Sequence, residues 1–235
     1  MRISIIVPVL NEGEAIGAAI ETLAPLRRRG HELIVVDGGS SDGTPELARA
    51  ALDAPAVQVL AAPRGRASQM NAGARAASGE VLLFLHADTR LPEGADRAIE
   101  AGFARSERVW GRFDVRIDGA SPLLPAVAWF MNLRSRLTGI ATGDQAMFVR
   151  REAFARAGGF PPIALMEDIA MSARLKRLSA PLCLAEFVTT SGRRWERRGV
   201  LRTILLMWWL RLRFFLGAAP SALARRYDSY DGDRH

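Results

Sequence analysis

Apolar residues gather in four short runs through the first half of the chain, and each run is followed by polar or glycine-rich residues. The runs cover residues 3–10, 33–36, 57–61 and 81–85. Between the runs, apolar residues recur at the spacing of a helix, as at Ile16, Ile20 and Leu23. Strands that alternate with helices of this length predict right-handed crossovers and a single, mostly parallel sheet flanked by helices. The pattern therefore indicates an α/β fold.

The fourth run ends abruptly in polar residues. Val81 to Leu85 suits a strand buried on both faces of a sheet, and His86, Ala87 and Asp88 follow it directly. In open α/β sheets, ligands bind beyond the carboxyl ends of the strands, and a parallel sheet brings these ends to one edge. Asn11 follows the first run, so we expect it at the same edge, where it also offers an N-cap for the first helix.

The second half of the chain has a different pattern. Residues 109–117 alternate between apolar and polar positions, which is typical of an edge or antiparallel strand. The elements predicted after it are a helix over 122–137, a loop and short strand over 143–151, a turn over 158–162 and a helix over 166–178.

Several short motifs follow one another at characteristic spacing between residue 3 and about residue 178. They are Val7-Pro8 with Asn11-Glu12, the stretch Val36 to Thr44, Asn71-Ala72-Gly73, Ser78-Gly79-Glu80, Phe84 to Asp88, Arg150-Arg151, Gly158-Gly159-Phe160, and Glu167-Asp168 with Arg174. In this order, the motifs make the chain similar to the family 2 glycosyltransferases, and to their short bacterial subgroup labelled arsenosugar-type glycosyltransferases. The resemblance implies a GT-A fold with one Rossmann-like sheet.

The resemblance also implies a reaction. Such an enzyme transfers a sugar from a nucleotide-diphosphate donor, here a UDP-sugar, to an acceptor that the sequence does not identify, with inversion at the anomeric carbon. The family draws its catalytic base from the pair Glu167-Asp168, usually from the second member. Asp168 would then remove the proton of the acceptor hydroxyl as that hydroxyl attacks the sugar. A carboxylate that merely favours the start of a helix is the alternative reading of this pair.

The donor site implied by the family's motifs involves residues at the strand ends and beyond. They are Pro8, Asn11, Glu12, Asp37, Arg64, Arg66, Asn71, Ala87, Asp88 and Arg194. Asp37 would bind the nucleobase or ribose, although an aspartate in a glycine-rich loop also forms turns. Arg64 and Arg66 would contact phosphate or base, or would be solvated surface charges.

The leaving diphosphate needs a cation, and Mn²⁺ or Mg²⁺ is the expected cofactor. Asp88 is the best candidate ligand, since carboxylate oxygen suits these ions. The family usually has Asp-X-Asp at this point, whereas this chain has His86-Ala87-Asp88. His86 is therefore a second candidate metal ligand, with two alternatives: a hydrogen bond to a phosphate, or a cap at the strand end.

Acceptor-side candidates come from two later segments. Asp144 and Gln145 lie in the loop that begins at Gly143, and Trp195 follows Arg194 in a stretch similar to the Gln-X-X-Arg-Trp motif of processive members. Trp195 would stack on a sugar, or would simply pack in the core.

The motifs divide the chain into expected regions. We expect a catalytic domain over 1–195, with a nucleotide-sugar half over 1–106 and an acceptor half over 107–195. A helical apolar and basic segment over 196–224 and a disordered tail over 225–235 would follow.

Charge narrows the possible partners. The formal net charge is +7 and comes from arginine far more than lysine, which favours contacts with phosphate groups, anionic lipid or nucleic acid. Acidic residues at the strand ends argue against a basic module that binds nucleic acid, so no nucleic-acid partner is expected. A sugar nucleotidyltransferase is the rival enzyme, but the first strand lacks its glycine-rich phosphate loop. The start of the sequence lacks the pattern of a signal peptide, which predicts a cytoplasmic protein.

The stretch 200–217 combines leucines with Trp208, Trp209 and three arginines. Its uncharged part is too short to cross a bilayer. Arginines beside tryptophans suit the lipid headgroup zone, so peripheral association with the inner membrane face is expected. A helix packed on the catalytic domain or across a homodimer contact is the alternative.

Overall fold

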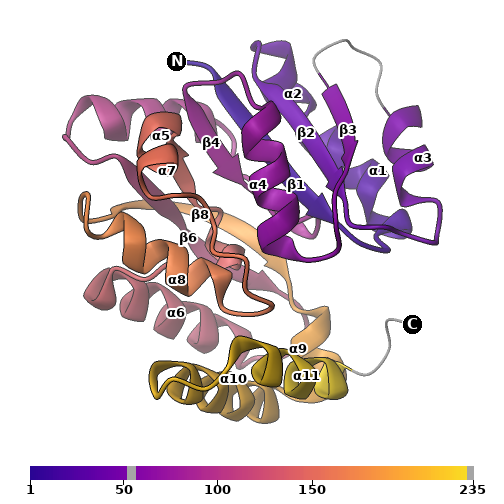
Figure 1. The fold of residues 1–235 in the computed structure, drawn as a ribbon, viewed down its shortest axis with the longest axis vertical. Coiled ribbons are helices and arrows are strands. Elements are labelled where there is room, and N and C mark those ends of the chain that lie inside the picture. Colours follow the sequence, from indigo (N-terminus) through magenta and orange to yellow (C-terminus); the bar gives the residue numbers. More distant parts are fainter. Residues whose placement is uncertain (52–56, 232–235) are drawn as a thin grey trace.

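The computed structural model describes residues 1–51 and 57–231, which form an eight-stranded sheet flanked by helices (Figure 1). The strand order is β3-β2-β1-β4-β7-β6-β8-β5. The strands are β1 (Ile3–Val9), β2 (Glu32–Asp37), β3 (Val57–Ala61), β4 (Val81–Phe84), β5 (Thr89–Arg90), β6 (Trp110–Asp118), β7 (Phe148–Arg150) and β8 (Leu182–Ser191).

The helices lie between the strands in sequence and continue beyond the last one. They are α1 (Gly13–Thr22), α2 (Ala24–Arg28), α3 (Thr44–Ala50), α4 (Arg66–Ala76), α5 (Ala95–Ala104), α6 (Leu124–Thr138), the short 3₁₀ helix η1 (Gly143–Gln145), α7 (Arg151–Arg156), α8 (Glu167–Leu175), α9 (Arg193–Arg198), α10 (Val200–Phe215) and α11 (Pro220–Asp231). The expected α/β fold is confirmed.

The N-terminal half of the sheet is parallel, as the apolar runs predicted. β1 pairs with β2 and β4, and β2 pairs with β3, all in parallel. The register places Val9 opposite Asp37 and Ile6 opposite Phe84, so the carboxyl ends of these strands meet at one edge. β1, β2 and β4 are buried on both faces because helices cover each face of the sheet, whereas β3 is an edge strand in which Gln58 and Ala61 are exposed.

The C-terminal half of the sheet is mixed. β7 is antiparallel to β4 and β6, whereas β6 is parallel to β8. β6 has the antiparallel neighbour that its pattern predicted, but it does not lie at an edge. Its first six residues are all buried, because β7 and β8 flank it on both sides.

Alternate side chains of the central strands build two separate cores. Ile5 and Val7 of β1 pack with α1, α2 and α5 on one face of the sheet. Ile6 of β1 packs with α4, α7 and α8 on the other face, where Phe160 stands edge-on to Phe84. The two faces meet different helices because successive strand residues point in opposite directions.

Asn11 does not cap the first helix as expected. It has a φ of 53°, and Glu12 occupies the N-cap position of α1. The Asn11 side chain instead accepts a hydrogen bond from the Ser41 backbone N–H at 2.9 Å. Asn11 thereby ties the loop after β1 to the loop after β2.

The last helices form a layer beneath α6 and α8 (Figure 1). Val200 of α10 packs with α6, and Leu210 of α10 packs with Ile169 of α8 and with Leu223 of α11. Among the described residues, no helix has both the length and the apolar character needed to cross a membrane.

The first part of the tail 225–235, which was expected to be disordered, is helical in this structure. α11 continues to Asp231, Leu223 is 2% exposed, and Tyr227 packs against the same cluster as Met166. Residues 232–235 of that predicted tail lie outside the described residues.

Candidate active site

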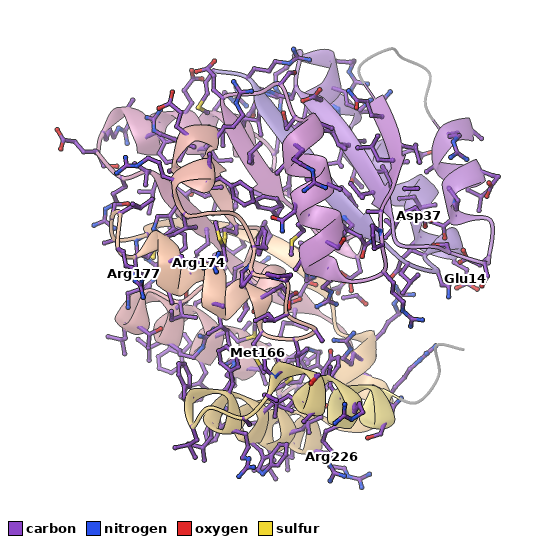
Figure 2. All side chains as sticks on the ribbon, in the orientation of Figure 1. Glu14, Asp37, Met166, Arg174, Arg177 and Arg226 are labelled. Carbon is purple, nitrogen blue, oxygen red and sulfur yellow. The ribbon has the colours of Figure 1, made fainter. Side chains whose placement is uncertain are left out.

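Two loops at the carboxyl edge of the sheet are joined by hydrogen bonds. One is the hydrogen bond from the Ser41 N–H to the Asn11 side chain. In another, the Thr44 hydroxyl oxygen accepts from the Glu12 N–H at 2.9 Å. Asp37 is 7% exposed and accepts from the N–H groups of Gly39 at 2.9 Å and Ser40 at 3.1 Å. Asp37 therefore forms the turn itself, and its position at the end of β2 is labelled in Figure 2.

His86 and Asp144 meet directly below the end of β4. The Nδ1 atom of His86 lies 3.4 Å from Oδ1 of Asp144. Burial alone would raise the pKa of Asp144, but His86, followed by Arg66 and Arg194, outweighs it and lowers the pKa to about 2. The Asp144 carboxylate is therefore held as an anion among three basic side chains.

The pair Glu167-Asp168 begins α8, directly after Met166. Met166 is 4% exposed and has a φ of 68°, a left-handed conformation that costs free energy in a side-chain-bearing residue. Figure 2 shows Met166 at the boundary between α8 and the α10–α11 layer. Met166 in this strained conformation is the N-cap of α8, and Glu167 and Asp168 form the first turn of the helix.

Asp168 holds the loop that carries Asp144. Its Oδ2 accepts the Gly143 N–H at 2.9 Å, and its Oδ1 accepts the Ile169 N–H at 2.7 Å. Glu167 is buried, and burial, followed by the charge of Asp168, raises the pKa of its carboxyl group. The raised pKa reflects burial and the proximity of two acidic side chains.

A narrow pocket brings these groups together. Its lining residues are Arg66, Met70, Phe84, His86, Gly143, Met147, Phe160, Glu167 and Asp168. Desolvation lowers the pKa of Arg66, but the charges of Glu167, Asp144 and Asp168 outweigh it and raise the pKa above its ordinary value. The pocket thus joins the end of β4, the start of α4 and the start of α8.

Other residues expected at the site have different positions. The Asn71 amide donates to the Phe160 carbonyl and accepts from its N–H, both at 2.9 Å, so it braces the turn before α8. Arg174 braces the same turn by donating to the Gly159 carbonyl at 3.0 Å. Pro8 lies within β1, Ala87 in the turn after β4, and Arg64 is exposed.

Two residues expected on the acceptor side, Gln145 and Trp195, make contacts within the protein. Gln145 is fully buried, and its amide accepts from the Thr142 N–H at 3.2 Å and donates to Asn132 at 3.3 Å. It shapes the loop from inside and has no surface for an acceptor. Trp195 packs against the hydrophobic cluster of α6 and Val200, while its neighbour Arg194 donates to the Tyr227 hydroxyl and faces Asp144.

The donor set for a cation is small. In the part of the chain that the structure describes, no group of three or more His, Cys, Asp and Glu side chains is placed to hold a metal. Asp88 is exposed, whereas His86 is engaged with Asp144. One exposed carboxylate fits Mg²⁺ or Mn²⁺ that takes its remaining ligands from phosphate oxygens and water.

Sequence reasoning missed two arginines that face this centre. Arg134 of α6 and Arg211 of α10 both lie near enough to Asp168 for its charge to act on their pKa values. A signal existed for Arg211, because at helical spacing it falls nearly opposite Arg202 and Arg213 of the same helix. Nothing in the sequence singled out Arg134.

The sequence of this chain is similar to those of known proteins. The family pattern described as Glycosyl transferase family 2 matches residues 4–157, more than half of the chain. The undecaprenyl-phosphate 4-deoxy-4-formamido-L-arabinose transferase of Yersinia pestis (strain Pestoides F) is 35% identical over 98 residues, which cover 39% of this chain and 30% of that protein. The match therefore spans less than half of either protein.

Solved structures share the fold at low sequence identity. S. aureus TarS in complex with UDP-GlcNAc has a TM-score of 0.66 and 18% identity, over 81% of this chain and 58% of that one. The mannosyltransferase PcManGT of Pyrobaculum calidifontis, in complex with GDP-Man and Mn²⁺, has a TM-score of 0.63 and 19% identity, over 99% of this chain and 70% of that one. Together with the family match, these likenesses show that the chain belongs to glycosyl transferase family 2 and has the GT-A fold.

Proposed function

We propose that this protein transfers a sugar from a nucleotide diphosphate, a UDP-sugar, to a hydroxyl group of an acceptor with inversion. One observation carries the proposal: Asp168 and the end of β4 line the same pocket, on the edge where donor-binding loops converge. The relatives support the donor class, since TarS is described with UDP-GlcNAc and PcManGT with GDP-Man.

The chemistry needs one proton acceptor and one place for the leaving group. Asp168 takes the proton of the acceptor hydroxyl while the hydroxyl oxygen forms a bond to the anomeric carbon. The bond from that carbon to the diphosphate breaks, and the nucleotide diphosphate leaves from the opposite face of the sugar. Each Asp168 oxygen accepts one backbone N–H, so the carboxylate is held in place and each oxygen keeps a further lone pair.

Basic groups stabilise the departing diphosphate. Arg66 lines the pocket, and Arg194 lies close enough to Asp144 to act on its pKa. Asp88 would hold Mn²⁺ or Mg²⁺, and such a cation supplies charge neutralisation at the leaving phosphates.

The proposed acceptor is linked to a lipid. α10 exposes large apolar side chains, with Trp208 66%, Leu212 58% and Phe215 69% accessible. With Leu205 and Arg226, residues of this face line a groove of about 540 Å³. Exposed arginines beside an apolar face complement an anionic lipid surface, so we assign this face to the membrane. The Y. pestis relative is named for an undecaprenyl-phosphate substrate, which agrees with that assignment.

Calorimetric titration with UDP and GDP, each with and without Mn²⁺, tests the proposal. We expect one nucleotide to bind in a Mn²⁺-dependent manner and Asp88→Ala to abolish that dependence. Glu152→Gln, an exposed acid on α7, is the matched control and should leave binding unchanged. Absence of nucleotide binding under every condition would contradict the proposed donor site.

A further inference from the structure

Two arginines near the active site have buried donor atoms without partners. Among the described residues, Nε and Nη2 of Arg134 and Nε of Arg211 make no hydrogen bond. Nη1 of Arg134 has a long contact with the Ile140 carbonyl at 3.4 Å. A buried guanidinium nitrogen without an acceptor destabilises the fold, and the missing acceptor can be supplied by water or by a bound anion.

Both arginines lie where α6, α8 and α10 meet. Leu210, the neighbour of Arg211, is fully buried against Met166 and Ile169, the residues that flank the catalytic pair. Ile140, whose carbonyl contacts Arg134, joins the same cluster. The two side chains therefore approach Asp168 from the side of the second half of the chain, away from the donor loops after β1 and β2.

The charges of this junction are unbalanced. Burial and then the charge of Arg211 lower the pKa of Arg134 to about 10, while Asp168 acts in the opposite direction. Burial also lowers the pKa of Arg211, against the charges of Asp168 and Asp144. The two cations thus repel each other, and the Asp168 oxygens accept hydrogen bonds from the backbone N–H groups of Gly143 and Ile169 instead.

Structural arginines elsewhere in this chain are treated differently. Arg112 is completely buried in β6 and donates to Asp114, whose other oxygen accepts from Arg136 at 2.5 Å. Asp96 similarly accepts from Arg29 at 2.7 Å. Nε of Arg112 also makes no hydrogen bond, but the Arg112 guanidinium group is paired with a carboxylate, whereas Arg134 and Arg211 have no carboxylate within ion-pair distance among the described residues.

We infer that Arg134 and Arg211 form a subsite for an anionic group of the acceptor, a phosphate monoester, beside the hydroxyl that Asp168 deprotonates. This inference rests on the proposed function and names the acceptor's chemical class. Two guanidinium groups match the charge of a phosphate monoester and supply planar pairs of donors to its oxygens. Arg211 lies on α10 with the exposed side chains Trp208 and Leu212. An apolar tail on the acceptor could therefore pack against this helix.

Phosphate binding to the full chain tests the subsite. The probes are inorganic phosphate and dodecyl phosphate, and the variants are Arg134→Gln and Arg211→Gln. We expect each variant to weaken phosphate binding about ten- to hundred-fold, because a hydrogen bond to a charged group is lost. Arg177→Gln, an exposed arginine after α8, is the control and should bind as the unchanged protein does. Tighter binding of dodecyl phosphate than of inorganic phosphate identifies a lipid source, and equal binding identifies a soluble one.

Thermal unfolding distinguishes a binding role from a structural one. Without phosphate, the two glutamine variants should unfold at the same or a higher temperature, because each removes an unpaired buried charge. With phosphate, the unfolding temperature of the unchanged protein should rise and that of the variants should not. Arg211→Lys, which keeps the charge, should retain part of the rise.

Three results would overturn the inference. They are unchanged phosphate binding in both variants, a lower unfolding temperature of the variants without phosphate, and a loss of UDP affinity in the variants, which would assign the arginines to the donor. UDP binding with Mn²⁺ is measured on the same samples. If UDP fails to bind while phosphate binding still depends on Arg134 and Arg211, the proposed transfer fails and the anion site stands.

Discussion

The Nδ1 atom of His86 lies 3.4 Å from Oδ1 of Asp144, so the end of β4 is joined to the loop that Asp168 holds. His86 occupies the place where the family usually has the first carboxylate of Asp-X-Asp. In this chain its ring contacts Asp144 in the loop that begins at Gly143. The end of β4 and the start of α8 are therefore connected through this loop.

Gly143→Ala should disrupt this connection. A Cβ atom at Gly143 would lie 2.4 Å from Nε2 and 2.5 Å from Cε1 of His86, so the ring or the loop must move. We expect sugar transfer to fall at least ten-fold while the fold persists, since a small misplacement of reacting groups has a large effect on rate. Initial rates of UDP release and the unfolding temperature measure both quantities. Gly17→Ala, where a Cβ meets nothing within 4 Å, is the control, and equal rates in both variants would contradict the prediction.

Asp168→Asn should remove the base and leave donor binding intact. Asparagine keeps a carbonyl oxygen that can accept the Gly143 N–H, so the loop keeps its anchor. We expect the transfer rate to fall by about 10²- to 10⁴-fold, the usual contribution of a general base. UDP affinity measured by calorimetry should not change. A variant with an unchanged rate would exclude Asp168 as the base.

Asp96→Asn should lower stability in a pH-dependent way. Burial alone would raise the pKa of Asp96, but hydrogen bonds from Arg29 and His31 outweigh it and lower the pKa to about 2. Because the folded pKa lies below the ordinary value of 3.8, this group stabilises the fold above about pH 4 and loses its contribution as the pH falls towards 2.

We therefore expect Asp96→Asn to lower the free energy of unfolding by about 2 kcal/mol at pH 7, and the difference from the unchanged protein to shrink below pH 4. Urea unfolding at pH 7, 5, 3 and 2 measures this. Glu46→Gln is the control, because the Glu46 side chain is 70% exposed and its pair with Arg49 is a surface contact. A difference that stays constant down to pH 2 would show that Asp96 acts through packing alone.

Trp208→Glu and Leu212→Glu should weaken binding to anionic lipid vesicles. Each removes an exposed apolar side chain from α10 and adds a negative charge, so we expect the partition coefficient to fall about ten- to hundred-fold. Sedimentation with phosphatidylglycerol vesicles measures binding, and Leu47→Glu on α3 is the control. Unchanged vesicle binding, together with a dimer that the same variants dissociate, would assign this face to a homodimer contact.

The strands of the N-terminal half were predictable because their signal is local. β1, β2, β3 and β4 begin or end within one residue of the predicted runs. For β1, β2 and β4 the reason is that an uninterrupted apolar run suits a strand covered on both faces, whereas β3 is an edge strand that Gln58 interrupts. The mixed half was less predictable. The sequence of β8 is not a long apolar run, so it gave no strong strand signal. The burial of β6 depends on pairing with β8, which is distant in sequence.

The candidate site residues were proposed from the order of their motifs. The residues Asp37, His86, Asp88, Glu167 and Asp168 stand out because they follow strands or begin a helix in a recognisable order. Asn71, Gln145 and Trp195 share those motifs, but they hydrogen-bond to or pack against other parts of the protein. A motif shows which residue is present at a position. It does not show which other residues that side chain will contact in the folded protein.

By itself, the sequence determined the alternating strands and helices, the polar strand ends and the family, because these depend on spacing along the chain. Only the tertiary structure decided that His86 meets Asp144, that Tyr227 packs with Met166, and that Arg134 and Arg211 lie near enough for the charge of one to act on the other. These relationships join residues far apart in sequence. These contacts are stabilised by burial and by charge interactions that exist only after the helices have packed. No local sequence pattern therefore predicts them.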